Sequence, residues 1–310
     1  MTDDTKTAAL MSIGELARNS GLSVRTIRFY CDEGILESQR SGGGHRMFDA
    51  DSATERLLLV RRLRALGLGL DSITGVLRGE QSMEEAIAAE SAKLDIEFSS
   101  LAWRRASVRA MEAAAPAQRA ERLALLAAAQ DGNALHENLI RFWHRILTPI
   151  PRSDSDGWVC WNVPEPPTDP SVDEVVTYAE LAALASSPDL NNAVRHQYWR
   201  DRPDLIRDPR ALYHAMGEIM IDVVPLVADG IPPHSGNELD RFVTAHATAR
   251  GERDTREFRE HLLRDATDSD PRIHRYWSLT DQLLGPRVTI GRAHDWLYNA
   301  LAETSAARAE

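Results

Sequence analysis

A pair of short helices separated by a tight turn, close to the amino terminus, most limits what this chain can fold into. Ser12 and Glu15 stand three residues apart at the start of an apolar helical pattern, which is the capping box that begins a helix. Residues 19–21 (Asn-Ser-Gly) end that helix, and Ser23 can cap a second one that runs through Tyr30. Two short helices joined by a glycine-containing turn are typical of a helix-turn-helix.

A small hairpin is expected after the second helix. The apolar segments 34–36 and 46–48 lie on either side of the glycine run 42–44, and this pattern predicts a wing that carries Arg40, His45 and Arg46. On the second helix, Val24, Ile27 and one of Phe29 or Tyr30 can anchor the helix to a core. The opposite face is polar and is the face that would meet a major groove; it carries Ser23, Arg25, Thr26 and Arg28.

The charge of the whole chain argues against a polyanionic partner, but the charge of its parts does not. With 36 basic and 47 acidic residues the formal net charge is −11. Residues 12–78 carry ten arginines against eight acidic residues, a net of +2, so the rest of the chain sums to −13. Arginine suits bidentate contacts to phosphate and guanine. The overall acidity therefore does not exclude a small DNA-binding module.

The region from Ser12 to about Arg78 resembles the MerR family of transcriptional regulators. Three motifs carry the resemblance in order: IGELARNSGLSVRTIRFYCDEGIL, GGGHRMFD and ATERLLLVRRLRALGLGLDSITGVL. The resemblance implies a homodimer with two winged helix-turn-helix heads on adjacent major grooves, which bends and undertwists an overlong promoter spacer so that RNA polymerase engages both promoter elements. By resemblance and position, the expected contacts to double-stranded promoter DNA are Ser23, Arg25, Thr26, Arg28, Tyr30, His45, Arg46 and Arg61.

Some positions depart from the family pattern or have a structural alternative. His45 stands where the family usually has tyrosine, although histidine can still donate a hydrogen bond to phosphate. Gly69 replaces the hydroxyl that commonly caps the next helix, and Asp71 is the expected substitute cap. Tyr30 can also belong to the core, and Arg61 to a solvated helix face.

A long helix without proline is expected from Ser82 to Ala115. Ser82 and Glu85 form a second capping signature. An apolar stripe at spacings of three, four and seven predicts a short coiled coil, interrupted by Arg105. The alternative is a helix packed on the carboxy-terminal region of its own chain, whereas the family resemblance favours antiparallel pairing across a dyad. The expected dimerisation residues are Ile87, Leu94, Phe98, Leu101 and Val108.

The rest of the chain predicts a bundle of roughly eight short helices, so the fold class is mostly α. Residues 158–163 (Trp-Val-Cys-Trp-Asn-Val) are the one candidate strand, within a long irregular connection over 149–170. Caps are expected at Ser171, Asp208, Ser235 and Asp270. The expected organisation is a flexible terminus 1–11, a winged head 12–80, a dimerisation helix 81–116 and a helical effector-binding or interaction domain 117–310.

Six of the seven tryptophans lie in this carboxy-terminal region. Large rings with one polar atom suit a pocket for a flat or greasy small organic effector, and they also suit a helical core. A loose likeness to the helical ligand-binding domains of TipA-like regulators favours the effector. The candidate effector-binding residues are Trp143, Trp158, Trp161, Trp199 and Trp277.

Other classes of function have little support in the sequence. Two cysteines, Cys31 and Cys160, exclude a thiolate metal sensor, and no nucleophile elbow, phosphate loop or histidine metal motif predicts an enzyme, a metal site or a cofactor. We expect no membrane span and a cytoplasmic protein. Two functions therefore remain: a regulator that responds to an effector, or one that binds DNA without a ligand and uses its carboxy-terminal domain for protein interaction or dimer stabilisation.

Overall fold

A computed structural model describes residues 9–200, 206–264 and 266–307. The chain divides into two compact units, one that ends at Glu97 and one that begins at Phe98. This boundary falls inside a single helix, α5 (Met83–Ala113), which the expected organisation treats as a separate dimerisation helix over 81–116. The reason is that one face of the second half of α5 is buried in the core of the second unit, as described below.

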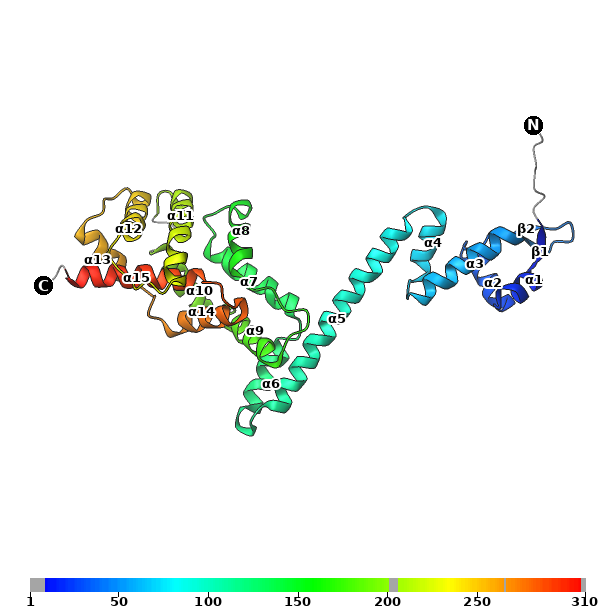
Figure 1. Ribbon diagram of the computed structural model, residues 1–310, viewed down its shortest axis with the longest axis horizontal. Helices are drawn as coiled ribbons and strands as arrows, with labels where there is room; N and C mark the ends of the chain where they lie inside the picture. Colours follow the sequence, from blue (N-terminus) through cyan, green and yellow to red (C-terminus); the bar gives the residue numbers. More distant parts are fainter. Residues whose placement is uncertain (1–8, 201–205, 265, 308–310) are drawn as a thin grey trace, which may run out of the picture. The chain divides into compact units, whose positions relative to one another are not determined.

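The first unit contains a three-stranded sheet made of β1 (Leu10–Ser12), β2 (Gln39–Arg40) and β3 (Arg46–Asp49); β1 and β2 are labelled in Figure 1. The strand order is β1-β3-β2. The antiparallel pair β2–β3 is the expected wing. Its turn contains Gly44 at φ +81°, a conformation that glycine adopts without strain. The expectation that residues 10 and 11 are flexible is wrong, because the backbone of Met11 pairs with Phe48 at the other edge of β3. Residues 1–8 lie outside the described residues.

The predicted helix-turn-helix is confirmed. Its helices are α1 (Ile13–Ser20) and α2 (Val24–Asp32). The backbone N–H of Glu15 donates to the Ser12 hydroxyl at 3.3 Å, and the Ser12 N–H donates to the Glu15 carboxylate at 2.8 Å. The Thr26 N–H donates to the Ser23 hydroxyl at 3.0 Å. Both helices therefore begin at the caps that the sequence predicts.

The head is completed by α3 (Ala50–Ala65) and α4 (Leu70–Arg78). Gly69 caps α4 without a side-chain hydrogen bond, so the expected cap at Asp71 is wrong. Asp71 lies inside the first turn, where a carboxylate still stabilises the positive end of the helix. The fully buried side chains of the head come from all four helices and from the wing; the largest are Leu16, Ile27, Ile35, Phe48, Leu68 and Ile73.

Helix α5 begins at the predicted capping box and has two different faces. The Glu85 N–H donates to the Ser82 hydroxyl at 3.0 Å, and the Ser82 N–H donates to the Glu85 carboxylate at 2.7 Å. One face packs into the core of the second unit through Trp103, Ala106 and Ala110. The expected alternative, a helix packed on its own chain, is thus confirmed for this face.

In the second unit all the regular secondary structure of the described residues is helical (Figure 1). A short 3₁₀ turn, η1 (Pro116–Gln118), follows α5, and the described part of the unit then contains ten helices, where about eight were expected. The helices are α6 (Arg119–Ala128), α7 (Gly132–Ile146), α8 (Arg152–Asn162), α9 (Val172–Ala185), α10 (Pro188–Trp199), α11 (Pro209–Ala228), α12 (Asn237–Arg250), α13 (Arg256–Arg264), α14 (Pro271–Leu284) and α15 (Ile290–Ala307).

Most of the predicted caps in this unit are confirmed. Side-chain oxygens of Ser171, Asp208 and Asp270 accept hydrogen bonds from the first turns of α9, α11 and α14. The cap expected at Ser235 is wrong, because α12 begins after Gly236 with no side-chain cap hydrogen bond.

The predicted strand at 158–163 is wrong, and the irregular connection expected over 149–170 is interrupted by a helix; only residues 149–151 and 163–170 lack regular structure. Residues 158–163 lie largely in α8, whose buried positions Ser155, Val159 and Asn162 are spaced by four and three residues. That spacing is helical. The apolar run was ambiguous because a continuous apolar segment has no period that separates a strand from a buried helix.

Helix α11 departs from the expectation that no segment is apolar enough to span a membrane. By length and composition alone it could cross one. Core helices of soluble proteins meet the same criterion, and α11 buries Leu212, Met216, Ile219 and Val223 in the core of the second unit.

Candidate DNA interface and ligand-binding region

The outer face of α2 carries the cationic groups expected at DNA. Arg25 and Arg28 are exposed, while Ile27 between them is fully buried and holds the helix to the head. Neither arginine has a hydrogen-bond or ion-pair partner among the described residues. The face therefore presents two guanidinium groups that are free to contact phosphates or base edges.

The other α2 candidates have structural roles as well. The Ser23 and Thr26 hydroxyl oxygens lie 2.8 Å apart at the start of the helix, so both side chains help to close its first turn. Tyr30 is half-buried and packs against the head core, which confirms it, and not Phe29, as the anchor; Phe29 is 44% exposed.

The wing places two candidates differently. His45 is exposed, and its backbone N–H donates to the Ser41 hydroxyl at 3.2 Å within the turn. Arg46 is half-buried and donates to the Asp32 carboxylate at 2.9 Å, an ion pair that ties the wing to the end of α2. Arg46 would have to share its guanidinium between Asp32 and a phosphate.

Arginines on α3 divide into two groups that the sequence did not separate. Arg61 is exposed and has no partner among the described residues. Arg56 instead donates to the Leu77 carbonyl at 2.9 Å, and Arg64 donates to the Leu68 carbonyl at 2.8 Å. These two arginines hold the α3–α4 corner together. Arg61 and its neighbour Arg62 are both exposed and have no partner among the described residues, so they are the α3 cations that are free to bind one.

The five candidate dimerisation residues are all exposed on α5. The exposed fractions are 40% for Ile87, 52% for Leu94, 53% for Phe98, 65% for Leu101 and 54% for Val108. A stripe of large apolar side chains in water is unusual for a single chain and is typical of an interface. The stripe lies on a different face from Trp103 and Ala106, which are buried.

The five candidate tryptophans mostly fill the core of the second unit. Trp143 and Trp199 are fully buried, and each indole N–H donates at 2.8 Å, to the Tyr276 hydroxyl and to the Ile146 carbonyl. Trp277 is 4% exposed, and Trp158 packs against Trp143 with 4.7 Å between ring centroids. No tryptophan lines the grooves described below. Their contribution to ligand binding stays a prediction.

Trp161 differs from the other four. It is 60% exposed at the end of α8, and the Arg287 guanidinium lies over its ring at 4.7 Å from the centroid. The same arginine donates to the Trp161 carbonyl at 3.2 Å. This cation–π pair ties α8 to the segment before α15.

A buried polar cluster, which sequence reasoning missed, connects the end of α10 with α15 and with the segment between α13 and α14. The Arg200 guanidinium forms a buried ion pair with Asp268, and Gln197 donates to the same carboxylate at 3.2 Å. Burial, with the nearby Arg200 charge, lowers the pKa of His294 to about 4, so this imidazole is neutral near neutral pH. Its two ring nitrogens have no hydrogen-bond partner among the described residues.

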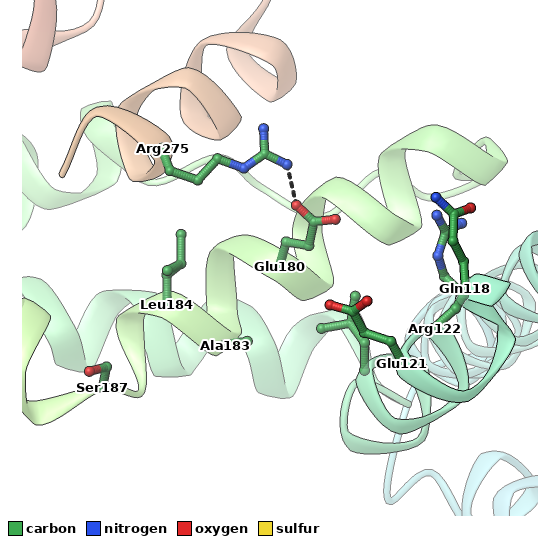
Figure 2. Close-up of a pocket in the computed structure, with 9 residues that line it drawn as sticks. Gln118, Glu121, Arg122, Glu180, Ala183, Leu184, Ser187 and Arg275 are labelled. Atoms are coloured by element: carbon green, nitrogen blue, oxygen red, sulfur yellow. Dashed lines mark hydrogen bonds and ion pairs between the residues drawn. The ribbon is translucent and has the colours of Figure 1, made fainter. Parts of the chain in front are cut away.

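The second unit also has surface grooves. One of about 530 Å³ lies between α6 and the pair α9–α14 (Figure 2). Its charged lining residues are Glu121, Arg122, Glu180 and Arg275. Another of about 500 Å³ lies between α5 and α6. Among the described residues, no three or more histidine, cysteine, aspartate or glutamate side chains gather in a way that could hold a metal ion.

Comparison with known proteins finds matches to the head of the chain. Residues 11–80 match the family model described as "MerR HTH family regulatory protein". The chain is 34% identical over 118 residues to the HTH-type transcriptional regulator MerD of Shigella flexneri, a match that covers 37% of this chain and 96% of MerD.

Two other relatives match over shorter shares of their own length. The nodulation protein NolA of Bradyrhizobium sp. is 35% identical over 98 residues, which are 31% of this chain and 41% of NolA. The transcriptional activator TipA of Streptomyces coelicolor is 39% identical over 67 residues, 21% of this chain and 26% of TipA. The chain thus matches about two fifths of the NolA relatives. No solved structure matches. With a family model on its helix-turn-helix and a match along almost all of MerD, this chain belongs to the MerR family of helix-turn-helix regulatory proteins.

Proposed function

We propose that the protein is a DNA-binding transcriptional regulator that acts as a homodimer on a near-palindromic promoter site. The observation that carries this proposal is the outer face of α2, where Arg25 and Arg28 are exposed and unpaired in a helix-turn-helix that belongs to a family of regulators. In such folds the second helix enters the major groove, and phosphate contacts supply much of the affinity.

The dimer is proposed to form through the apolar stripe of α5, with the two helices antiparallel. Residues 83–97 carry five acidic residues and one lysine, a net of −4, and residues 98–113 carry three arginines and one glutamate, a net of +2. Antiparallel pairing lays the acidic half of one helix against the basic half of its partner. Parallel pairing would oppose like charges, which disfavours it.

A two-fold dimer matches a two-fold DNA site, because each head reads one half-site. By analogy with the family, the dimer is proposed to bend and undertwist the promoter so that RNA polymerase can engage it. MerD and TipA carry names of transcriptional regulators, which supports a cytoplasmic regulator and not an enzyme.

The second unit is proposed to respond to a small organic effector. The groove between α6 and α9–α14 supports this role, since its volume of about 530 Å³ is that of a small-molecule site. The alternative, a ligand-independent interaction or dimer-stabilising module, is supported by the core position of Trp143, Trp199 and Trp277.

The DNA proposal is tested with a duplex selected by the protein itself. Wild-type protein is used to select binding sequences from a random duplex library, and affinity for the selected duplex is then measured by fluorescence anisotropy. We expect Arg25→Ala/Arg28→Ala to lose about 100-fold or more in affinity, since four arginines of the dimer are removed. The matched control, Arg145→Ala/Arg253→Ala, removes two exposed arginines of the second unit that have no partner among the described residues. If circular dichroism shows that both double variants are folded and they bind the selected duplex with equal affinity, the proposal is refuted.

The dimer proposal is tested by sedimentation velocity. Leu94→Asp/Leu101→Asp places two charges in the stripe and is expected to yield a monomer. Ile221→Asp is the control, because Ile221 is 73% exposed on α11 and lies outside the stripe. A dimer that survives the double change would show that α5 does not hold it together.

A further inference from the structure

Helix α6 forms one wall of the groove in Figure 2, and its charged groups there have no ion-pair partner among the described residues. Glu180 and Arg275, on α9 and α14, pair with each other on the opposite side of the groove. Glu121 and Arg122 on α6 line the same groove and have no ion-pair partner among the described residues. The α6 wall therefore presents one free carboxylate and one free guanidinium to whatever occupies the groove.

The remaining lining is partly apolar. Leu125 comes from α6, while Ala183 and Leu184 come from α9. With two glutamates and two arginines the charged lining sums to zero. A ligand with a single charge would leave one of the two α6 groups unpaired, whereas a ligand that carries both charges would satisfy both.

From this arrangement we propose that the groove binds a small dipolar molecule whose ammonium and carboxylate groups are joined by an apolar part. The ammonium group pairs with Glu121, the carboxylate pairs with Arg122, and the apolar part lies on Leu125 and Leu184. The assignment rests on the proposed role as a ligand-responsive regulator and gives that role a site and a ligand class.

The position of α6 also indicates how such a ligand would act on the dimer. On another face of α6, Leu126 packs in the core, and the Trp103 indole of α5 donates to the Ala129 carbonyl, just after α6, at 2.8 Å. The groove between α5 and α6 is lined by Met111, Leu123 and Val108, a residue of the proposed dimer stripe. A ligand that draws α6 toward α9 and α14 therefore changes the surroundings of the stripe.

The test uses the full chain and three probes in isothermal titration calorimetry. The probes are the dipeptide leucyl-leucine with free termini, its N-acetylated form without the ammonium group, and its C-terminal amide without the carboxylate. We expect saturable binding of the free dipeptide, and binding weaker by about tenfold or more for each blocked form, as removal of one charge-assisted hydrogen bond implies.

Two variants test which side chain of the groove binds each charged group of the dipeptide. Glu121→Gln is expected to remove the preference for the free ammonium group, and Arg122→Gln the preference for the free carboxylate. The matched controls Glu257→Gln and Arg145→Gln change exposed residues on α13 and α7 and should bind like the wild type. The proposal is overturned by an absence of saturable binding at about 10 mM dipeptide, or by binding that Glu121→Gln and Arg122→Gln leave unchanged.

Affinity for the selected DNA duplex, measured without dipeptide on the same preparations, separates this site from the regulator proposal. Intact DNA binding without dipeptide binding overturns the ligand site alone. Failure of the wild type to bind any DNA sequence specifically would overturn the function on which the site rests.

Discussion

The head and the second unit differ in where their unpaired and paired arginines lie. In the head, Arg25, Arg28 and Arg61 are exposed and without partners among the described residues. In the second unit many arginines pair with carboxylates on other turns or helices, as in Arg105–Asp169, Arg200–Asp268, Arg210–Asp154, Arg241–Asp222, Arg259–Asp240 and Arg275–Glu180. What indicates a nucleic-acid surface in this chain is therefore not net charge but the position of Arg25 and Arg28, which have no partner among the described residues, on the outer face of the helix-turn-helix.

The pairs of the second unit differ in burial, and the largest effect is expected at the buried pair. Both side chains of Arg200–Asp268 are 1% exposed. Asp268→Asn leaves a buried guanidinium without its counter-charge and should lower the free energy of unfolding by about 3–5 kcal/mol. Urea denaturation followed by circular dichroism measures this change.

Asp169→Asn is the matched control, because the Arg105–Asp169 pair is about half exposed, at 51% and 54%. It should cost about 1 kcal/mol or less. Equal costs for the two variants would show that burial does not distinguish these pairs.

The next effect is a pH dependence of the second unit. Burial lowers the pKa of His294 to about 4 and holds that of His246 well below its usual value. The unfolded chain therefore binds more protons than the folded chain as the pH falls below about 6.5, and stability decreases by about 1.4 kcal/mol per pH unit for each such proton. Burial raises the pKa of Asp295 to about 6, which acts in the opposite direction between about pH 6 and pH 4. Burial also raises the pKa of Asp281, which acts like Asp295, while the hydrogen bond from the Arg272 side chain lowers the pKa of Asp270, which acts with the histidines. Between about pH 6.5 and pH 6, where the histidines act before Asp295 takes up its proton, stability decreases toward acid.

His294→Leu should reduce the difference in unfolding free energy between about pH 7 and about pH 5, measured in urea. His45 of the head is exposed, so His45→Gln serves as the control and should leave the difference unchanged. If the difference in unfolding free energy between the two pH values is the same in His294→Leu as in the wild type, groups other than His294 cause the pH dependence.

A smaller effect is expected at the cap of α2. Ser23→Ala removes the acceptor of the Thr26 N–H and should destabilise the head by about 1 kcal/mol, whereas Ser23→Asn keeps an acceptor. Thermal unfolding gives the stability, and anisotropy gives the DNA affinity. If Ser23→Asn keeps the stability of the head but loses DNA affinity, the Ser23 hydroxyl also contacts DNA. If Ser23→Asn keeps both, the role of Ser23 is to cap α2.

Local signals made the head predictable. The caps at Ser12 and Ser23 and the glycine turn of the wing lie within a few residues of the bonds that they form, so the sequence predicts them directly. The pairing of Met11 with Phe48 was missed because it joins distant segments, and the apolar run at 158–163 was misassigned because its composition suits a strand and a helix alike.

The second unit was less predictable for the same reason. Arg200 and Asp268 lie 68 positions apart, and the groove beside α6 is lined by three separate helices. Neither has a sequence spacing that could reveal it. The tryptophans were recognisable as important, but their type alone does not separate a core from a pocket, and their burial favours the core.

The salt dependence of DNA affinity tests the central claim most directly, since it reports how many phosphates the unpaired cations neutralise. Affinity for the selected duplex is measured over a range of salt concentrations for the wild type, Arg25→Ala/Arg28→Ala and Arg145→Ala/Arg253→Ala. We expect the slope of log affinity against log salt to become shallower by about one for each phosphate that the head variant no longer neutralises, and to stay at the wild-type value in the second-unit variant. Equal slopes for all three proteins would contradict the claim that the unpaired arginines of the head bind DNA.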